Sequence, residues 1–264
     1  MRKCLVVAGG ILLGDFVHMI PILNRICSMG YEDITLITGT YERIVSEFLK
    51  NFYPISKIMY LDDGHPTDLN SRKQFLEHVN NTFPNIVSDP SFDCVFSDIK
   101  MTMDMVGVND GDWSWGKGFT LEETYLPDPK GLLKFDKKEE QIVVQGSTLH
   151  SFKKFDTIKE VNFPLPVVTI GAPNEYLFPN SKDLRGHTFL EVAQEMMKSC
   201  LFVGIHSSCT CLAFYLNIES VICHPSTSSS LFRFDRFRDP KRFTELLGPT
   251  KNEIEGAIRK KLYE

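Results

Sequence analysis

The sequence lacks the apolar run of ~18–20 residues that a membrane-spanning helix needs. Its first apolar stretch, residues 4–8, ends at Gly9-Gly10 without the small-residue cleavage site of a secretory signal. Its seven cysteines are scattered and odd in number, which suits reduced thiols better than a disulfide framework. We therefore expect a cytoplasmic protein with no transmembrane segment.

An excess of basic charge is also missing. The formal net charge is −5, so we expect no overall attraction to nucleic acid or to an anionic membrane. With 42% hydrophobic and 24% charged residues, the 264-residue chain has the composition of an ordinary globular protein. This length can bury a sizeable core and fits one large domain or two small ones.

Metal-binding signatures are weak. Residues 200–224 contain four cysteines and two histidines, but no two of these cysteines form a Cys-x-x-Cys pair. Cys200 and Cys223 adjoin or lie within predicted strands, where small buried thiols are the better interpretation. The nearest approach to an Asp-x-Asp motif, at residues 110–112, has the composition of a loop. We expect neither a metal site nor a cofactor.

Apolar runs that suit buried strands alternate in the first half with amphipathic stretches that suit helices. Strands are predicted at residues 4–9, 34–38, 58–61 and 94–96, and helices at residues 15–29, 42–50 and 71–80. Residues 100–140 break this pattern, and the charged run 134–140 has the composition of a linker.

The alternation resumes after this linker. Strands are predicted at residues 142–145, 167–170, 201–205 and 221–223, and helices at residues 189–199, 208–216, 238–247 and 252–262. Such alternation predicts parallel sheets that are covered by helices. We therefore expect an α/β protein with two Rossmann-like domains facing a cleft, residues 1–138 and 139–264.

Groups suited to phosphate follow three of the predicted strands, at the ends where open α/β sheets bind ligands. The first is the loop 9–15, which ends in Gly14 and Asp15 and enters a helix. Its glycines permit close backbone approach, and a helix N-terminus favours an anion. Asp15 alternatively serves as an N-cap or first-turn acid. His18 lies one turn later on the same helix face, where it orients Asp15 or has a structural role.

The second segment follows the first predicted strand of the second half. Ser147 and Thr148 end this strand, and Lys153 and Lys154 follow a few residues later. Hydroxyls, backbone amides and lysines are suitable ligands of a diphosphate. A polar turn with solvated lysines is the alternative interpretation.

The third segment, residues 204–210, is a predicted strand-to-helix junction. His206, Ser207 and Ser208 lie within it. Free amides and hydroxyls at such a junction would also receive phosphate. Plain N-capping by Ser207 or Ser208 is the alternative.

The order and spacing of four segments resemble the heptosyltransferase family of GT-B glycosyltransferases. Residues 14–21 match its Gly-Asp-aliphatic-aliphatic-x-x-x-Pro opening, and residues 171–175 match its Gly-x-x-x-Glu segment. Residues 183–190 resemble its Asp-Leu-x-Gly-Lys-Thr-x-Leu motif. Residues 203–213 resemble its Val-Gly-x-Asp-Ser-Gly-x-x-His-Leu-Ala motif.

The resemblance implies a role for each matching residue. Asp15 would be the base that deprotonates the acceptor hydroxyl, Glu175 would reach the donor ribose, and His187 would lie by the nucleobase. The diphosphate leaving group would be held by Ser147, Thr148, Lys153 or Lys154, Ser207 and Ser208. Amides and a lysine neutralise a departing diphosphate without metal. The implied partners are a nucleotide-sugar donor and an acceptor saccharide.

Two departures from the family motif leave the donor open. His206 stands where the family has an aspartate, and Cys211 stands where it has a histidine. Two other functions therefore remain as alternatives. Residues 232–238 interleave phenylalanine with arginine, which would suit a glycosyltransferase acting on a modified DNA base. A non-catalytic nucleotide-sugar binding protein is the second alternative.

Overall fold

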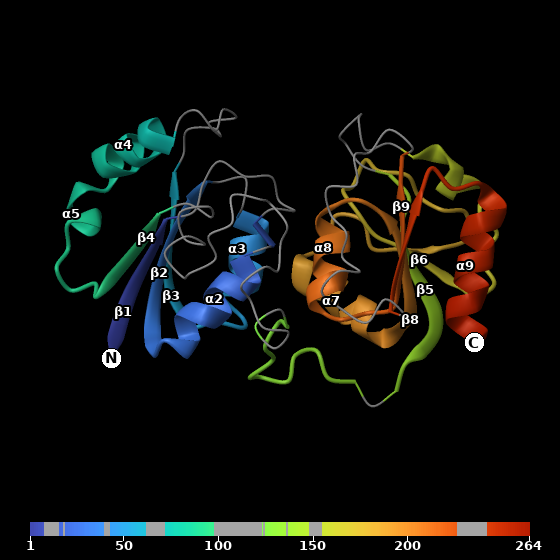
Figure 1. Cartoon of the computed structure of the whole chain (residues 1–264), viewed down its shortest axis with the longest axis horizontal. Coiled ribbons are helices and arrows are strands. Elements are labelled where there is room, and N and C mark those ends of the chain that lie inside the picture. Colours follow the sequence, from blue (N-terminus) through green and yellow to red (C-terminus); the bar gives the residue numbers. More distant parts are fainter. Residues whose placement is uncertain are drawn as a thin grey trace. The chain divides into compact units, whose positions relative to one another are not determined.

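Parallel strands and covering helices form both halves of the chain in a computed structural model (Figure 1). The structure describes residues 1–7, 16–17, 19–39, 43–61, 72–97, 123, 125–135, 137–147, 155–225 and 242–264. These residues divide into two compact units, of which the first ends at Lys130 and the second begins at Gly131. In the described part of the chain, no helix is long and apolar enough to cross a membrane.

The first unit contains a four-stranded parallel sheet in the order β3-β2-β1-β4. Its strands are β1 (Arg2–Val7), β2 (Tyr31–Gly39), β3 (Ile55–Leu61) and β4 (Cys94–Ser97). Its helices are α2 (Met19–Ser28), α3 (Arg43–Leu49), α4 (Arg72–Thr82) and α5 (Pro84–Val87). Helices α2 and α3 lie on one face of the sheet, and α4 and α5 lie on the other (Figure 1). All four predicted strands of this half are confirmed.

Glu123 and Tyr125 are held against α2 in the first unit. The Arg25 guanidinium binds both carboxylate oxygens of Glu123, at 2.7 and 2.6 Å. The Asn24 amide donates to the backbone oxygens of Glu123 and Tyr125, at 2.7 and 2.8 Å. The Tyr53 hydroxyl in turn donates to the Asn24 side-chain oxygen at 2.9 Å, so this attachment continues into the core.

The second unit contains a six-stranded parallel sheet in the order β10-β9-β8-β5-β6-β7. Its strands are β5 (Glu139–Gln145), β6 (Val167–Thr169), β7 (Lys182–Asp183), β8 (Ser199–Ile205), β9 (Ser220–His224) and β10 (Phe243–Leu247). Its helices are α7 (Phe189–Lys198), α8 (Ser208–Tyr215) and α9 (Lys251–Tyr263), with a 3₁₀ helix at Asp156–Glu160. Together the two sheets confirm the expected α/β class with two Rossmann-like domains.

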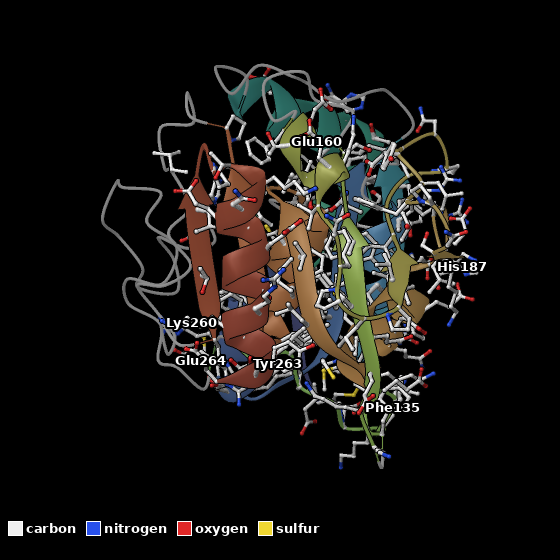
Figure 2. All side chains as sticks on the ribbon, turned by 90° about the vertical axis from the view of Figure 1, so that its right-hand side faces the viewer. Phe135, Glu160, His187, Lys260, Tyr263 and Glu264 are labelled. Atoms are coloured by element: carbon white, nitrogen blue, oxygen red, sulfur yellow. The ribbon has the colours of Figure 1, made fainter. Side chains whose placement is uncertain are left out.

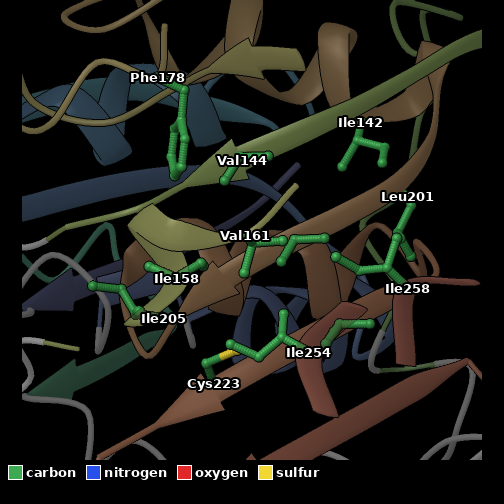
Figure 3. Close-up of a cluster of buried hydrophobic side chains, with 12 residues drawn as sticks. Ile142, Val144, Ile158, Val161, Phe178, Leu201, Ile205, Cys223, Ile254 and Ile258 are labelled. Atoms are coloured by element: carbon green, nitrogen blue, oxygen red, sulfur yellow. The ribbon is translucent and has the colours of Figure 1, made fainter. Parts of the chain in front are cut away.

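Alternate residues of the central strands separate the two faces of this sheet. Val144, Val203 and Cys223 point into the core that Ile254 and Ile258 of α9 complete (Figure 3). Helices α7 and α8 cover the opposite face (Figure 1). Gln145 and His224 are the last residues of β5 and β9 and follow residues of the α9 face, so they belong to the face covered by α7 and α8.

The two long helices of the second unit begin at capping boxes. Thr188 caps α7, where its hydroxyl accepts from the backbone N–H of Glu191 and the Glu191 carboxylate binds the Thr188 N–H. Thr250 and Glu253 repeat this arrangement at α9. Each box satisfies two backbone donors that the helix itself leaves free, which explains why the helices start at these residues.

The prediction of a helix at residues 238–247 is wrong for residues 243–247. Phe243–Leu247 form strand β10, which pairs in parallel with Ser220–His224 of β9. The edge of β9 offers backbone groups that an added strand satisfies, and this tertiary pairing overrides the weak local helical pattern. This pairing brings Glu245 beside β9.

Candidate functional site at the carboxyl edge of the second sheet

Polar side chains gather where β5, β8 and β9 end. These three strands are neighbours in the sheet, so their carboxyl ends lie side by side. Gln145 is 4% exposed, Ser207 is 8% exposed and His224 is 5% exposed. Polar groups buried to this extent need hydrogen-bond partners. The carboxyl edge of an open parallel sheet is also where such folds bind their ligands.

Gln145 links two segments that are far apart in sequence. Its side-chain oxygen accepts a hydrogen bond from the Ser207 hydroxyl. Its Nε2 donates to Glu175 Oε2 at 3.1 Å. A single glutamine therefore fixes Glu175 relative to the turn that starts α8.

The Glu175 carboxylate packs against Gly171, which follows β6 and has a backbone conformation that favours glycine. Gly171 has a φ of +132°, and a Cβ at this position would come within 2.3 Å of Glu175 Oε2. Burial raises the pKa of Glu175, and the hydrogen bond from Gln145 opposes this rise only in part. The carboxylate is therefore held in a partly desolvated position.

The segment that carries Glu175 is fixed from both sides. The Ser147 hydroxyl accepts from the backbone N–H of Tyr176 at 2.7 Å. The Arg185 guanidinium donates to the backbone oxygen of Glu175 and pairs with Asp183, at 2.9 and 2.8 Å. This bidentate pair lowers the pKa of Asp183 to about 2. These hydrogen bonds give Ser147 and Arg185 a structural role, which is to position the segment that carries Glu175.

The N-terminus of α8 is the part of this edge best suited to an anion. The Ser207 hydroxyl caps the helix by accepting from the backbone N–H of Thr210 at 3.3 Å. The N-capping alternative is thus confirmed for Ser207. Helices leave their first N–H groups without internal partners, and no described residue bonds those of Ser208 and Cys209. These two amides can receive a phosphate oxygen.

Cys209 is buried beside this turn. Burial, and next the negative charge of Glu175, raise the pKa of the Cys209 thiol to about 12. A thiol with this pKa is protonated at neutral pH and is a poor nucleophile. Gln145, which bonds both Glu175 and the Ser207 cap, holds this carboxylate near the start of α8.

A second polar group continues along the edge. His206 and His224 meet edge to face, with ring centroids 5.7 Å apart. His224 Nε2 lies 2.9 Å from Glu245 Oε1. Within the described residues, His224 Nδ1 and Glu245 Oε2 are buried and have no hydrogen-bond partner. Each such atom costs roughly 1–3 kcal/mol unless something binds it.

His187 is separate from these groups. Its side chain is 41% exposed, and its Nδ1 lies 3.4 Å from Glu191 Oε2 within the first turn of α7. Figure 2 shows His187 at the outer edge of the second unit. None of its hydrogen bonds or ring contacts in the described part of the chain reaches Gln145, Ser207 or His224.

The other predicted site residues lie outside the described residues. They are Gly14, Asp15, His18, Thr148, Lys153 and Lys154. Residues 232–238, which motivated the DNA-base alternative, lie outside them as well. Among the residues that are described, no group of three or more His, Cys, Asp or Glu side chains could hold a metal ion.

The sequence interpretation missed three residues of this edge as site residues. Gln145 ends the apolar run 142–144, and a polar residue at the end of a buried strand was the available signal. His224 ends β9 in the same way. No sequence pattern indicated that Glu245 lies at the site, because the segment containing it was predicted to be a helix.

These features define the class of the fold. Two parallel sheets, each covered by helices, form the two Rossmann-like halves of a GT-B type architecture. The E. coli heptosyltransferase WaaC with ADP is similar, with a TM-score of 0.62 and 12% identity over 98% of this chain and 100% of that chain. A glycosyl transferase family 9 structure from Veillonella parvula has a TM-score of 0.56 and 12% identity, over 98% and 89% of the two chains. The resemblance seen in the sequence is confirmed for the fold.

The same fold also occurs with another chemistry. A UDP-N-acetylglucosamine 2-epimerase has a TM-score of 0.53 and 9% identity, over 100% of this chain and 88% of that chain. Neither a protein-family model nor a curated protein matches the sequence. The fold alone therefore does not determine the activity.

Proposed function

We propose that this protein is a glycosyltransferase that moves a sugar from a nucleotide diphosphate donor to an acceptor hydroxyl. The donor diphosphate binds at the N-terminus of α8, on the amides of Ser208 and Cys209. The observation that carries the proposal is the hydrogen-bonded set of Gln145, Glu175 and Ser207 around this turn. It presents a capped helix N-terminus beside a half-buried carboxylate, at the edge where parallel sheets bind nucleotides.

The roles that the heptosyltransferase resemblance implies are chemically consistent with one another. Amides neutralise the charge that develops on the departing diphosphate, and Lys153 or Lys154 would add a positive charge. Glu175 accepts hydrogen bonds from ribose hydroxyls, which suits its acceptor oxygens. Asp15 removes the proton of the acceptor hydroxyl as general base. We propose that the reaction needs no metal and no cofactor.

Related folds support this choice of reaction. The WaaC structures carry ADP and ADP-2-deoxy-2-fluoro heptose, which are a nucleotide diphosphate and a nucleotide-sugar analogue. The carboxyl edge described above offers groups for both the phosphate and the sugar of such a ligand. The acceptor is a saccharide in this proposal, and a modified DNA base is the alternative acceptor.

Ser208→Asp tests the phosphate site sharply. An acid in the first turn of a helix is favourable for folding, so the variant should fold, while its charge repels a phosphate at the same amides. Affinities for ADP, UDP, GDP, CDP and TDP are measured by titration calorimetry, with Ser208→Asn as the neutral control of similar size. We expect loss of binding in Ser208→Asp alone. Equal affinities in both variants would contradict the phosphate site.

Product analysis then separates transfer from its alternatives. A labelled nucleotide sugar is incubated with and without saccharide acceptors or hydroxymethylated DNA, and with EDTA. Transfer that persists in EDTA supports the proposal, whereas restoration by a divalent cation would contradict the metal-free mechanism. Binding without any turnover would identify a non-catalytic binding protein. Altered sugar without acceptor would identify an epimerase.

A further inference from the structure

The pair formed by His224, at the end of β9, and Glu245, in the middle of β10, has unused hydrogen-bonding capacity. His224 is 5% exposed, and the Glu245 side chain is 13% exposed. The Nε2 of His224 bonds one carboxylate oxygen of Glu245 at 2.9 Å. The other nitrogen and the other oxygen are buried and reach no partner in the described part of the chain.

The chemistry of the pair fixes what it can bind. If the Glu245 carboxylate carries no proton, it only accepts hydrogen bonds, and the hydrogen between the two groups then lies on His224 Nε2. In the neutral ring, His224 Nδ1 is then an acceptor. Two open acceptors call for ligand groups that donate hydrogen bonds. Hydroxyl groups of a sugar have this character, whereas an ionised phosphate does not.

The position of the pair connects it to the phosphate site. His224 contacts the ring of His206, and His206 directly precedes the Ser207 cap of α8. Both histidines therefore lie beside the turn whose amides are proposed to bind the diphosphate. In a nucleotide sugar, the transferred sugar is joined directly to this diphosphate.

We propose that His224 and Glu245 bind hydroxyl groups of the donor sugar and so determine which sugar the protein accepts. This rests on the proposed nucleotide-sugar function and assigns the pair to its sugar moiety. His206 forms the wall between the phosphate site and this sugar site. His206 stands where the heptosyltransferase motif has an aspartate, and His224 and Glu245 lie outside that motif.

Glu245→Gln is the first test variant. The glutamine oxygen still accepts from His224, so folding is preserved, but the amide replaces the open acceptor with a donor. A second variant, His224→Phe with Glu245→Leu, removes both acceptors and leaves no buried charge unpaired. It retains an aromatic ring against His206. Thermal unfolding of both variants establishes that they are folded.

Calorimetric affinities are measured for five nucleoside diphosphates (ADP, UDP, GDP, CDP and TDP) and for their glucose conjugates. We expect both variants to bind the preferred glucose conjugate about tenfold more weakly or worse, which corresponds to one lost hydrogen bond to a charged group. The affinity for the free nucleoside diphosphate should remain as in the wild type. Unchanged affinity for the conjugate would overturn the proposal. An equal loss for both ligands would also overturn it, by placing the pair at the nucleoside.

Glu195→Gln serves as the matched control. Glu195 is also a buried carboxylate of the second unit, bonded to Lys182 and Gln141 at 2.9 Å each. It lies near Ser199, the first residue of β8, about 20 Å along the strand from the carboxyl edge. Glu195→Gln should change neither affinity. If the wild type binds none of the ten ligands, the sugar site and the proposed function are both overturned.

Discussion

The Ser207 hydroxyl donates a hydrogen bond to the side-chain oxygen of Gln145, and this contact joins the carboxyl ends of β8 and β5. Ser207 at the same time caps α8, and Gln145 at the same time binds Glu175. The two residues are 62 positions apart in sequence. They connect the helix that is proposed to bind phosphate with the carboxylate that is proposed to bind ribose.

Gln145→Leu should damage this connection at nearly constant side-chain volume. The Ser207 hydroxyl and Glu175 each lose a partner while they remain buried or half-buried. We expect a loss of roughly 1–3 kcal/mol in the free energy of unfolding, and nucleoside diphosphate affinity at least tenfold weaker. Denaturant unfolding and calorimetry measure the two effects.

Gln194→Leu is the control for this substitution. Gln194 donates one hydrogen bond, to the backbone oxygen of Leu132 at 3.1 Å, and it belongs to α7 rather than to the carboxyl edge. Its replacement should leave nucleotide affinity unchanged. Equal affinities for Gln145→Leu and the wild type would show that the Gln145 contacts do not shape the binding site.

Glu175→Gln should change how stability depends on pH. Burial raises the folded-state pKa of Glu175 above its ordinary value of 4.5. The folded protein therefore holds this proton more tightly than the unfolded chain, and its stability falls as the pH rises through the interval above 4.5. Glu175→Gln removes this loss, so its stability relative to the wild type should increase between pH 4 and pH 7.

Glu191→Gln should change the pH dependence of stability in the opposite direction. Hydrogen bonds from Thr188 lower the pKa of Glu191 below 4.5, so its contribution is present above that pH and is lost as the pH falls. This variant should become less stable than the wild type at neutral pH, with the difference vanishing in acid. Thermal unfolding of the two variants and the wild type at a series of pH values measures both effects. Parallel curves for Glu175→Gln and the wild type would contradict the burial of Glu175.

Gly171→Ala and Gly256→Ala should act in opposite directions. At Gly171 a Cβ meets Glu175 Oε2 at 2.3 Å and the φ is +132°, so alanine should cost roughly 1–3 kcal/mol and displace the carboxylate. Gly256 lies inside α9, and a Cβ there meets nothing within 4 Å. Alanine at this position should stabilise the protein by roughly 0.5–1 kcal/mol. Denaturant midpoints for the two variants compare the effects directly.

Asp15→Ala tests the proposed base. A general base acts on the acceptor, so the variant should lose transfer by ~10²–10⁴-fold while its affinity for the nucleoside diphosphate stays nearly unchanged. Single-turnover assays with labelled donor, together with calorimetry, measure the two quantities. Turnover near that of the wild type would remove Asp15 from the mechanism.

The strands were predictable because they carry their signal locally. The apolar runs 142–144 and 201–203 are buried on both faces, as central parallel strands must be, so hydrophobicity alone identifies them. β10 was not predictable in this way. Its residues pattern ambiguously, and the edge of β9 decides their conformation through hydrogen bonds between distant segments.

Some residues of the site were likewise predictable from local sequence patterns, and others were not. Ser207 was predicted because a cap and a strand-to-helix junction are local patterns, and its capping role is now confirmed. Gln145 meets Glu175 and Ser207 because of the strand order in the sheet, and no local sequence pattern indicates that order. His224 and Glu245 likewise meet only because β10 adds to the edge of β9.

A crystal structure with a bound nucleoside diphosphate would locate the donor site directly. The ligand should be the one that binds most tightly in the calorimetric series. We expect its phosphates on the backbone amides of Ser208 and Cys209, with a ribose hydroxyl against Glu175. A nucleotide bound instead at the loop 9–15, with the start of α8 empty, would show that the first half binds the donor and the second half the acceptor.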